Sequence, residues 1–185
     1  MKKRKLKFDF SAGAILLPAA LWFLCDWPML AALMLAAAFH ELGHLAALRA
    51  FGCRVTGLYA DAGGLTIARR GCMPAAGETV CALAGPLMGG LYALAGSYLG
   101  ESMGSEVLAM SAGMSLALSI FNLLPAPPLD GGRVLAALAG DAAAAKAGLI
   151  LGVCMLSAGL ALIGRGYGAA LFIAGVWLTL AQAGL

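Results

Sequence analysis

The chain has 185 residues and a net charge of only +3. Hydrophobic residues make up 62% of it and charged residues 11%, and its mean hydropathy is +0.93. A water-soluble domain of this length needs far more polar surface. The composition therefore excludes an ordinary soluble globular protein and indicates a single integral-membrane domain over residues 1–185.

The N-terminus is basic. Five positive charges precede the first apolar segment: Lys2, Lys3, Arg4, Lys5 and Lys7. Such a flank is typical of a membrane-anchored first span and also of a secretory signal peptide. A second apolar segment follows at once and no small-x-small cleavage site stands out, so we expect an uncleaved span. The cluster is too short to predict nucleic-acid binding.

Six apolar segments are predicted to cross the bilayer as helices. They are Ser11–Leu24, Met29–Leu48, Glu78–Leu99, Val107–Leu123, Ala147–Ile163 and Gly168–Ala183. The predicted fold is thus all-α and polytopic, with about six spans. Gly85 and Gly89 form a G-x-x-x-G in the third segment, a spacing that favours ordinary close helix packing.

The charges predict an orientation. With the N-terminus in the cytoplasm, eleven of the twelve basic residues fall on the cytoplasmic side, and Arg165 alone falls outside. Positive residues favour the cytoplasmic side of membrane proteins. We therefore expect a multi-pass protein of the cell membrane with a cytoplasmic N-terminus.

Two stretches depart from the spanning pattern. Val55–Tyr59 and Leu65–Ala68 are β-prone and flank Gly63-Gly64, which predicts a small hairpin on the cytoplasmic side. Asn122–Arg133 contains three prolines and two glycines, which prevent a continuous helix. Because irregular backbone at membrane depth is tolerated only in protein or beside a wet cavity, we expect this break to border a functional cavity.

The motif His40-Glu41-Leu42-Gly43-His44 lies inside the second apolar segment. Positions i and i+4 share one face of a helix, so both imidazoles can bind one zinc ion, with Glu41 as general base. Zinc lowers the pKa of an attacking water to about 7 and polarises the scissile carbonyl. Glu41 would take the water proton and pass it to the leaving amine.

Three features favour a metal site over a hydrogen-bonded histidine pair. The chain has two histidines, and both are in the motif. Polar residues within an apolar span are functional candidates by default. At 1.5 Å per residue, His40 lies about 17 Å from the outer face of a core about 30 Å thick, just past the midplane toward the cytoplasm.

A catalytic zinc ion usually has three protein ligands. Since the chain has no third histidine, the remaining ligand must be Asp, Glu or Cys. We favour Asp130, because it follows the broken segment at a depth similar to that of His44. The alternative for Asp130 is an N-cap of the helix after it. Asp61 and Glu78 are weaker candidates, since both fall near the cytoplasmic boundary. The five scattered cysteines form no C-x-x-C pair, and we expect free thiols.

The motif at residues 40–44, Gly85-Pro86 in the next segment and the NLLPAPPLDGGR loop resemble the site-2 protease family of intramembrane metalloproteases. The resemblance runs from the second segment through Arg133 and is strongest to the stage IV sporulation protein FB branch. It implies zinc ligands His40, His44 and Asp130, the catalytic base Glu41, and a loop asparagine, Asn122, that holds the substrate backbone or the developing oxyanion. A loop-capping side chain is the alternative for Asn122.

The resemblance also implies a reaction and partners. We expect zinc-dependent hydrolysis of a membrane-embedded or membrane-associated protein, such as a sporulation pro-sigma factor, a membrane-tethered regulator or a remnant signal peptide. The implied partners are the lipid bilayer, this substrate and a regulatory membrane protein, and we expect no nucleic acid. Many relatives carry a PDZ domain, and the sporulation branch often carries a CBS domain; we expect neither here.

Three other functions fit parts of the pattern. A metal transporter would use the His-Glu-His site, but it should show a repeat-related second binding element, and none is visible. A non-catalytic relative would be expected to have lost Glu41 or a ligand. A protease acting on soluble proteins is disfavoured by the apolar run before His40. The hairpin could bind an unwound substrate by β-augmentation, through Val55–Tyr59 or Leu65–Ala68, or could be inert.

Overall fold

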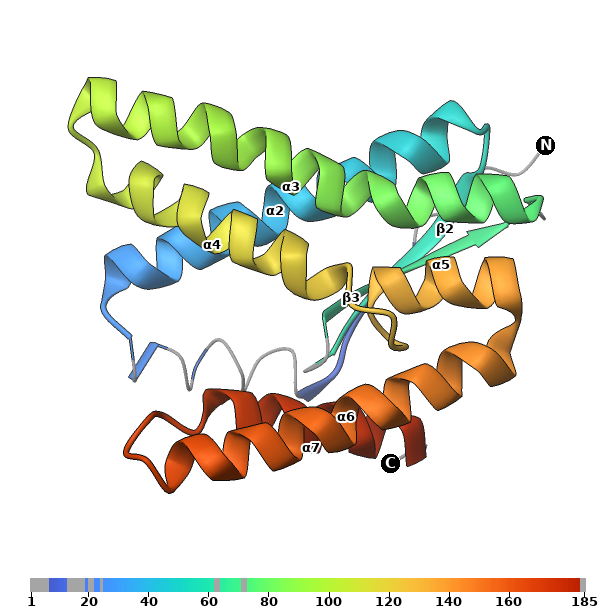
Figure 1. Ribbon diagram of the computed structural model, residues 1–185. Coiled ribbons are helices and arrows are strands. Elements are labelled where there is room, and N and C mark those ends of the chain that lie inside the picture. Colours follow the sequence, from blue (N-terminus) through green and yellow to red (C-terminus); the bar gives the residue numbers. More distant parts are fainter. Residues whose placement is uncertain are drawn as a thin grey trace. The chain divides into compact units, whose positions relative to one another are not determined.

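A computed structural model describes residues 7–12, 19, 22–23, 25–61, 64–70 and 73–183 (Figure 1). The described strands are β1 (Lys7–Phe10), β2 (Arg54–Asp61) and β3 (Gly64–Arg70). The described helices are α2 (Trp27–Ala50), α3 (Ala75–Met103), α4 (Glu106–Asn122), α5 (Asp130–Ala139), α6 (Asp141–Ile163) and α7 (Ala170–Ala183). The predicted mostly helical fold with a small hairpin is confirmed.

The chain divides into two compact units. The first contains Met1–Met73 and Ala84–Ser119, and the second contains Pro74–Leu83 and Ile120–Leu185. The first unit therefore holds the sheet, α2 and most of α3 and α4. The second holds the proline-rich break, α5, α6 and α7, together with the first turns of α3.

The helices match the predicted apolar segments closely. Among the described residues, α2, α3 and α6 are long and apolar enough to cross a membrane, while α4 and α7 are shorter apolar helices. The predicted first span, Ser11–Leu24, lies largely outside the described residues. The helix α6 begins at Asp141, six positions before the predicted start at Ala147. The alanines that precede Lys146 have high helix propensity, which the hydropathy pattern alone does not report.

The hairpin is one part of a larger sheet. The strands β2 and β3 pair antiparallel, with Leu58 opposite Ile67 and Tyr59 opposite Thr66. A strand that the sequence did not predict, β1, pairs parallel with β2, and the strand order is β1-β2-β3. The basic residues around Lys7 had suggested only a membrane flank. Because β2 is the central strand, the prediction that Val55–Tyr59 offers a free edge is wrong, whereas β3 is an outer strand of this sheet.

The first unit buries serines beside its small apolar residues and exposes several large apolar side chains. On α4, Ser111 and Ser115 are fully buried, while Leu116 is 50% exposed. The Ser115 hydroxyl donates a hydrogen bond of 2.9 Å to the carbonyl of Gly89 on α3. This arrangement suits lipid as the surrounding solvent, because lipid does not drive leucine inward and small residues let the helices approach closely.

The second unit packs around a small apolar core. Ala126 and Leu129 of the proline-rich break are buried together with Met155 of α6 and Leu178 of α7. The helices α6 and α7 lie side by side (Figure 1). Gly140, at φ +89°, links α5 to α6 in a conformation that residues with a side chain rarely adopt. The break is therefore anchored in this core through Ala126 and Leu129, while Leu123, Pro125 and Pro128 are exposed.

The cysteines form no disulfide bond among the residues that the structure describes. Cys25, Cys53, Cys81 and Cys154 are free thiols, and Cys72 lies outside the described residues.

The helix α3 should tolerate a methyl group at one glycine and not at another, because only one of them faces α4. A Cβ at Gly100 would lie 2.7 Å from the backbone nitrogen of Ala109, whereas a Cβ at Gly90 of the same helix meets nothing within 4 Å. We expect Gly100→Ala to lower the free energy of unfolding by about 1–3 kcal/mol through overpacking. Gly90→Ala should be neutral or stabilising by up to about 1 kcal/mol through helix propensity.

Thermal unfolding in detergent measures both variants. Equal melting temperatures for Gly100→Ala and Gly90→Ala would show that the close approach of α3 and α4 is absent in the membrane protein.

Candidate metal-binding active site

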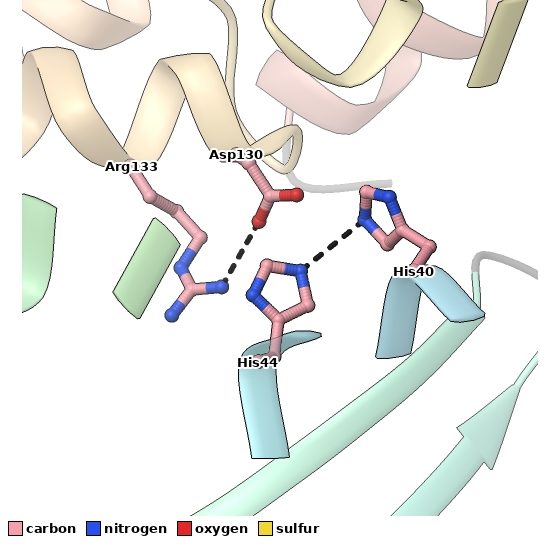
Figure 2. Close-up of polar contacts among 4 residues, drawn as sticks. All are labelled: His40, His44, Asp130 and Arg133. Atoms are coloured by element: carbon pink, nitrogen blue, oxygen red, sulfur yellow. Dashed lines mark hydrogen bonds and ion pairs between the residues drawn. The ribbon is translucent and has the colours of Figure 1, made fainter. Parts of the chain in front are cut away.

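The helix α2 brings the two histidines of the motif together. Pro28 lies in the first turn of α2, where a missing N–H costs nothing, and the helix then runs unbroken to Ala50. His40 and His44 are 4% and 6% exposed. Their Nε2 atoms lie 3.2 Å apart, and the rings meet edge to face with centroids separated by 4.9 Å (Figure 2).

This spacing suits a shared metal ion. Zinc–nitrogen bonds of about 2.0–2.1 Å in a tetrahedral site place two ligand nitrogens about 3.3 Å apart. The observed 3.2 Å between the Nε2 atoms is close to that edge. Without a metal ion, the two nitrogens can form a hydrogen bond only when one is protonated and donates while the other accepts. The pair can therefore hold a divalent ion without moving either helical backbone position.

Glu41 follows His40 on the same helix and is partly buried. One residue along a helix is a rotation of about 100°, so its side chain leaves the helix at a different angle from the two imidazoles. A carboxylate that flanks a metal position without sharing the face of the ligands has the placement expected of a general base.

Two glycines allow α3 to approach the histidine pair. A Cβ at Gly85 of α3 would overlap the ring of His44. A Cβ at Gly43 of α2 would overlap the carbonyl of Ala84, and it would lie 2.7 Å from the Cβ of Met88. The close contact between α2 and α3 is therefore built at the motif itself. It confines the His44 ring to one side of α2.

The G-x-x-x-G pair in α3 has two different partners. Gly89 faces α4, where a Cβ would overlap the hydroxyl of Ser119, and this is the ordinary packing expected from the sequence. Gly85 instead faces His44. The expectation of packing alone is thus incomplete, because one of the two glycines makes room for a candidate ligand.

An aromatic contact supports the same helix pair one turn away. Phe39 of α2 stacks on Tyr92 of α3, with ring centroids 4.0 Å apart and planes inclined by 9°. The Tyr92 hydroxyl shares a hydrogen bond of 2.6 Å with Ser111 of α4. These contacts hold three helices of the first unit beside His40, which immediately follows Phe39.

Asp130 lies in the second unit as the first residue of α5. It is 5% exposed, and its Oδ1 accepts a hydrogen bond of 3.1 Å from the guanidinium of Arg133, one turn later on α5 (Figure 2). Leu129 occupies the N-cap position, so the alternative in which Asp130 caps the following helix is wrong. Because Arg133 is 46% exposed on its side chain, solvent screens this pair, which orients the carboxylate more than it stabilises the fold.

The start of α5 is packed tightly against the break. Cβ atoms at Gly131 and Gly132 would overlap the backbone of Leu123 and of Ala126, respectively. These glycines let the first turn of α5 lie directly on the preceding loop. The position of the Asp130 backbone therefore depends on the conformation of that loop.

The other predicted residues occupy defined places. Asn122 is the last residue of α4 and is partly buried. Asp61 ends β2 opposite Gly64, and Glu78 lies in the first turn of α3. The structure thus brings the imidazoles of His40 and His44 together, and it pairs the carboxylate of Asp130 with the guanidinium of Arg133.

Sequence reasoning missed the roles of Gly43, Gly85 and Arg133. Gly43 lies within the His-Glu-Leu-Gly-His motif, and Gly85 belongs to the G-x-x-x-G pair. Neither pattern predicts which residue the glycine contacts. Arg133 follows Asp130 by three residues on a predicted helix, which is a spacing that commonly pairs opposite charges.

Replacement of Gly85 should damage metal binding without unfolding the protein. In Gly85→Ala, the new methyl group displaces the ring of His44, so we expect the affinity for zinc to fall by about 100-fold, at the upper end of the range for residues that orient ligands. The matched control is Gly90→Ala on the same helix, which should retain the wild-type affinity. Competition with a chromogenic chelator measures both. An unchanged affinity in Gly85→Ala would contradict the assignment of His44 to a metal site.

Comparison with known proteins gives a family match for part of the chain and a similar fold for nearly all of it. Residues 82–163 match Peptidase family M50. The comparison with proteins of curated function found no match. Among solved structures, the site-2 protease from Methanocaldococcus jannaschii superposes with a TM-score of 0.69 at 22% sequence identity, over 99% of this chain and 92% of that chain. The chain thus has the fold of a site-2 protease and carries a segment that matches Peptidase family M50.

Proposed function

We propose that this protein is an intramembrane zinc metalloprotease that hydrolyses a peptide bond of a membrane-embedded or membrane-associated protein. One observation carries the proposal. Two buried imidazoles lie with their Nε2 atoms 3.2 Å apart on an apolar helix of spanning length, and a glutamate follows the first of them. Burying such a group of polar side chains in a membrane helix is costly, and function is the usual reason for it.

The family match supports the proposal independently of the motif. The matched segment, residues 82–163, contains Asn122 and Asp130 but does not contain His40, Glu41 or His44. Two separate parts of the chain therefore indicate the same activity. Agreement of this kind is hard to explain by the chance occurrence of a short motif.

The proposed zinc ligands are His40, His44 and Asp130. All three side chains are buried, and two imidazoles with one carboxylate form a donor set that suits zinc. A zinc ion held there would supply Lewis acidity, which makes water a nucleophile near neutral pH and polarises the scissile carbonyl. Arg133 would orient the carboxylate of Asp130 for this task, as residues behind metal ligands commonly do.

The remaining chemistry belongs to the chain's own side chains. Glu41 takes the proton of the attacking water and delivers it to the leaving amine. Asn122, at the end of α4, donates a hydrogen bond to the substrate backbone or to the developing oxyanion. The outer strand β3 offers an edge for an unwound substrate segment.

The proposal extends to topology and substrate. The distribution of basic residues supports a cytoplasmic N-terminus, with the site in the cytoplasmic half of the bilayer. The loop NLLPAPPLDGGR supports kinship with the stage IV sporulation protein FB branch. A pro-sigma factor or a membrane-tethered regulator is then the expected substrate class.

Metal analysis of detergent-purified protein tests the ligand set and needs no substrate. We expect about one zinc ion per chain in the wild type. His44→Ala and Asp130→Asn should each lose or weaken that zinc, because each removes one ligand, while Glu41→Gln should retain it. Zinc lost only with His44→Ala would show that Asp130 is the wrong third ligand. No zinc in the wild type, even after reconstitution, would contradict the proposal.

Proteolysis in reconstituted vesicles tests the reaction. Against a panel of fluorescent single-span peptides, Glu41→Gln should lower the rate of hydrolysis by about 10²–10⁴-fold while zinc content stays at the wild-type level, because it removes the base and not a ligand. Zinc transport across the same vesicles, without cleavage of any peptide, would instead support the transporter alternative.

A further inference from the structure

The last helix contacts the loop that leads to Asp130. Gln182 lies near the end of α7, and its side-chain amide donates a hydrogen bond to the carbonyl of Pro127. The two residues are separated by 55 positions in the sequence, so no local pattern predicts the contact. Both are partly buried in the second unit. The chemistry described for the active site does not use Gln182.

Room for this amide comes from a glycine on α6. A Cβ at Gly148 would lie 2.8 Å from Cδ of Gln182 and 3.1 Å from its Nε2. Gly148 is buried, and it packs directly against the amide group. The seam between α6 and α7 is therefore shaped so that the Gln182 side chain can pass α6 and reach the loop.

Pro127 is mechanically coupled to the first turn of α5. A Cβ at Gly132 would overlap the nitrogen of Pro127, so the helix start lies in van der Waals contact with the loop backbone at the residue that Gln182 holds. Leu129 donates its backbone N–H to the carbonyl of Ala126 at 2.9 Å, which closes the turn between them. A shift of Pro127 would therefore be transmitted to α5, of which Asp130 is the first residue.

We infer that Gln182 is a positioning residue for Asp130. It acts through the carbonyl of Pro127, and the seam glycine Gly148 keeps its amide in place. The inference rests on the proposed function in one respect, namely that Asp130 binds zinc. The anchoring of the loop is a separate physical statement and can be measured without metal.

The variant Gln182→Met removes the donor and keeps a side chain of similar length. Its matched control is Thr179→Val, one turn earlier on α7. Thr179 also packs against a glycine of α6, Gly152, but its hydroxyl donates to Gly175 of its own helix. Each substitution removes one hydrogen bond from the same seam, and only Gln182→Met releases the loop.

A second pair of variants leaves Gln182 in the sequence. Gly148→Ala pushes the Gln182 amide away from its position, whereas Gly152→Ala pushes on Thr179. If Gln182 acts as inferred, Gly148→Ala should reproduce the effect of Gln182→Met, and Gly152→Ala should behave like Thr179→Val.

Two readouts separate positioning from general stability. The first is hydrogen exchange over residues 123–132 in metal-free protein, which we expect to be about tenfold faster in Gln182→Met and Gly148→Ala than in the wild type. The second is zinc affinity by chelator competition, which should fall by about tenfold in the same two variants. Both controls should match the wild type in both readouts, whatever their melting temperatures.

Unchanged loop exchange and unchanged zinc affinity in Gln182→Met, with zinc bound normally by the wild type, would overturn the inference and leave the proposed function intact. Equal losses in Gln182→Met and Thr179→Val would also overturn it, because they would show a merely structural seam. Failure of the wild type to bind zinc would overturn the proposed function, and the role of Gln182 toward a ligand with it.

Discussion

The histidine pair requires that α2 and α3 approach each other at the level of the motif. Two imidazoles with Nε2 atoms 3.2 Å apart need a fixed ring orientation, and a helix surface alone leaves the rotamers free. The glycines Gly43 and Gly85 let the neighbouring backbone and the His44 ring lie in contact. Helix packing therefore fixes the ring orientation and the spacing of the two nitrogens, and that spacing suits a shared metal ion.

Buried serines accompany the close packing of the helices. Small residues bring α3 and α4 together, and the serines between them donate to backbone carbonyls, as Ser115 does to Gly89. Hydrogen bonds of this kind add only about 0.6 kcal/mol each in membranes, so shape complementarity contributes most of the association. Several leucines lie on the outside, as Leu116 does, where a soluble protein would bury them.

In the second unit, the carboxylate of Asp130 directly follows an irregular stretch of backbone, which has to be held in a fixed conformation. The prolines prevent a helix before Asp130, and the freed backbone groups must then be satisfied by other parts of the protein. Ala126 and Leu129 anchor the break in the core formed with α6 and α7, and Gln182 satisfies the carbonyl of Pro127. The last two helices thus have a role beyond anchorage in the membrane, because they give the break a defined shape.

The sequence by itself determined the features that depend on near neighbours. Apolar runs predicted five of the described helices, and two β-prone runs around Gly63-Gly64 predicted the pairing of β2 with β3. The motif spacing placed His40 and His44 on one helix face. Each follows from contacts within a few residues, where helix and strand geometry alone decide the outcome. The proline-rich break was likewise visible, since proline and glycine act on their own backbone.

Only the tertiary structure decided the features that join distant residues. The strand β1 was not predicted, because Lys7 and the basic residues before it are equally typical of a membrane flank. Gly85 and Gly89 share one motif, but only the fold shows that one faces His44 and the other Ser119. The bond from Gln182 to Pro127 spans 55 positions. Contacts between distant residues depend on how whole helices pack. The pattern of residues along the chain does not show which helices lie against each other.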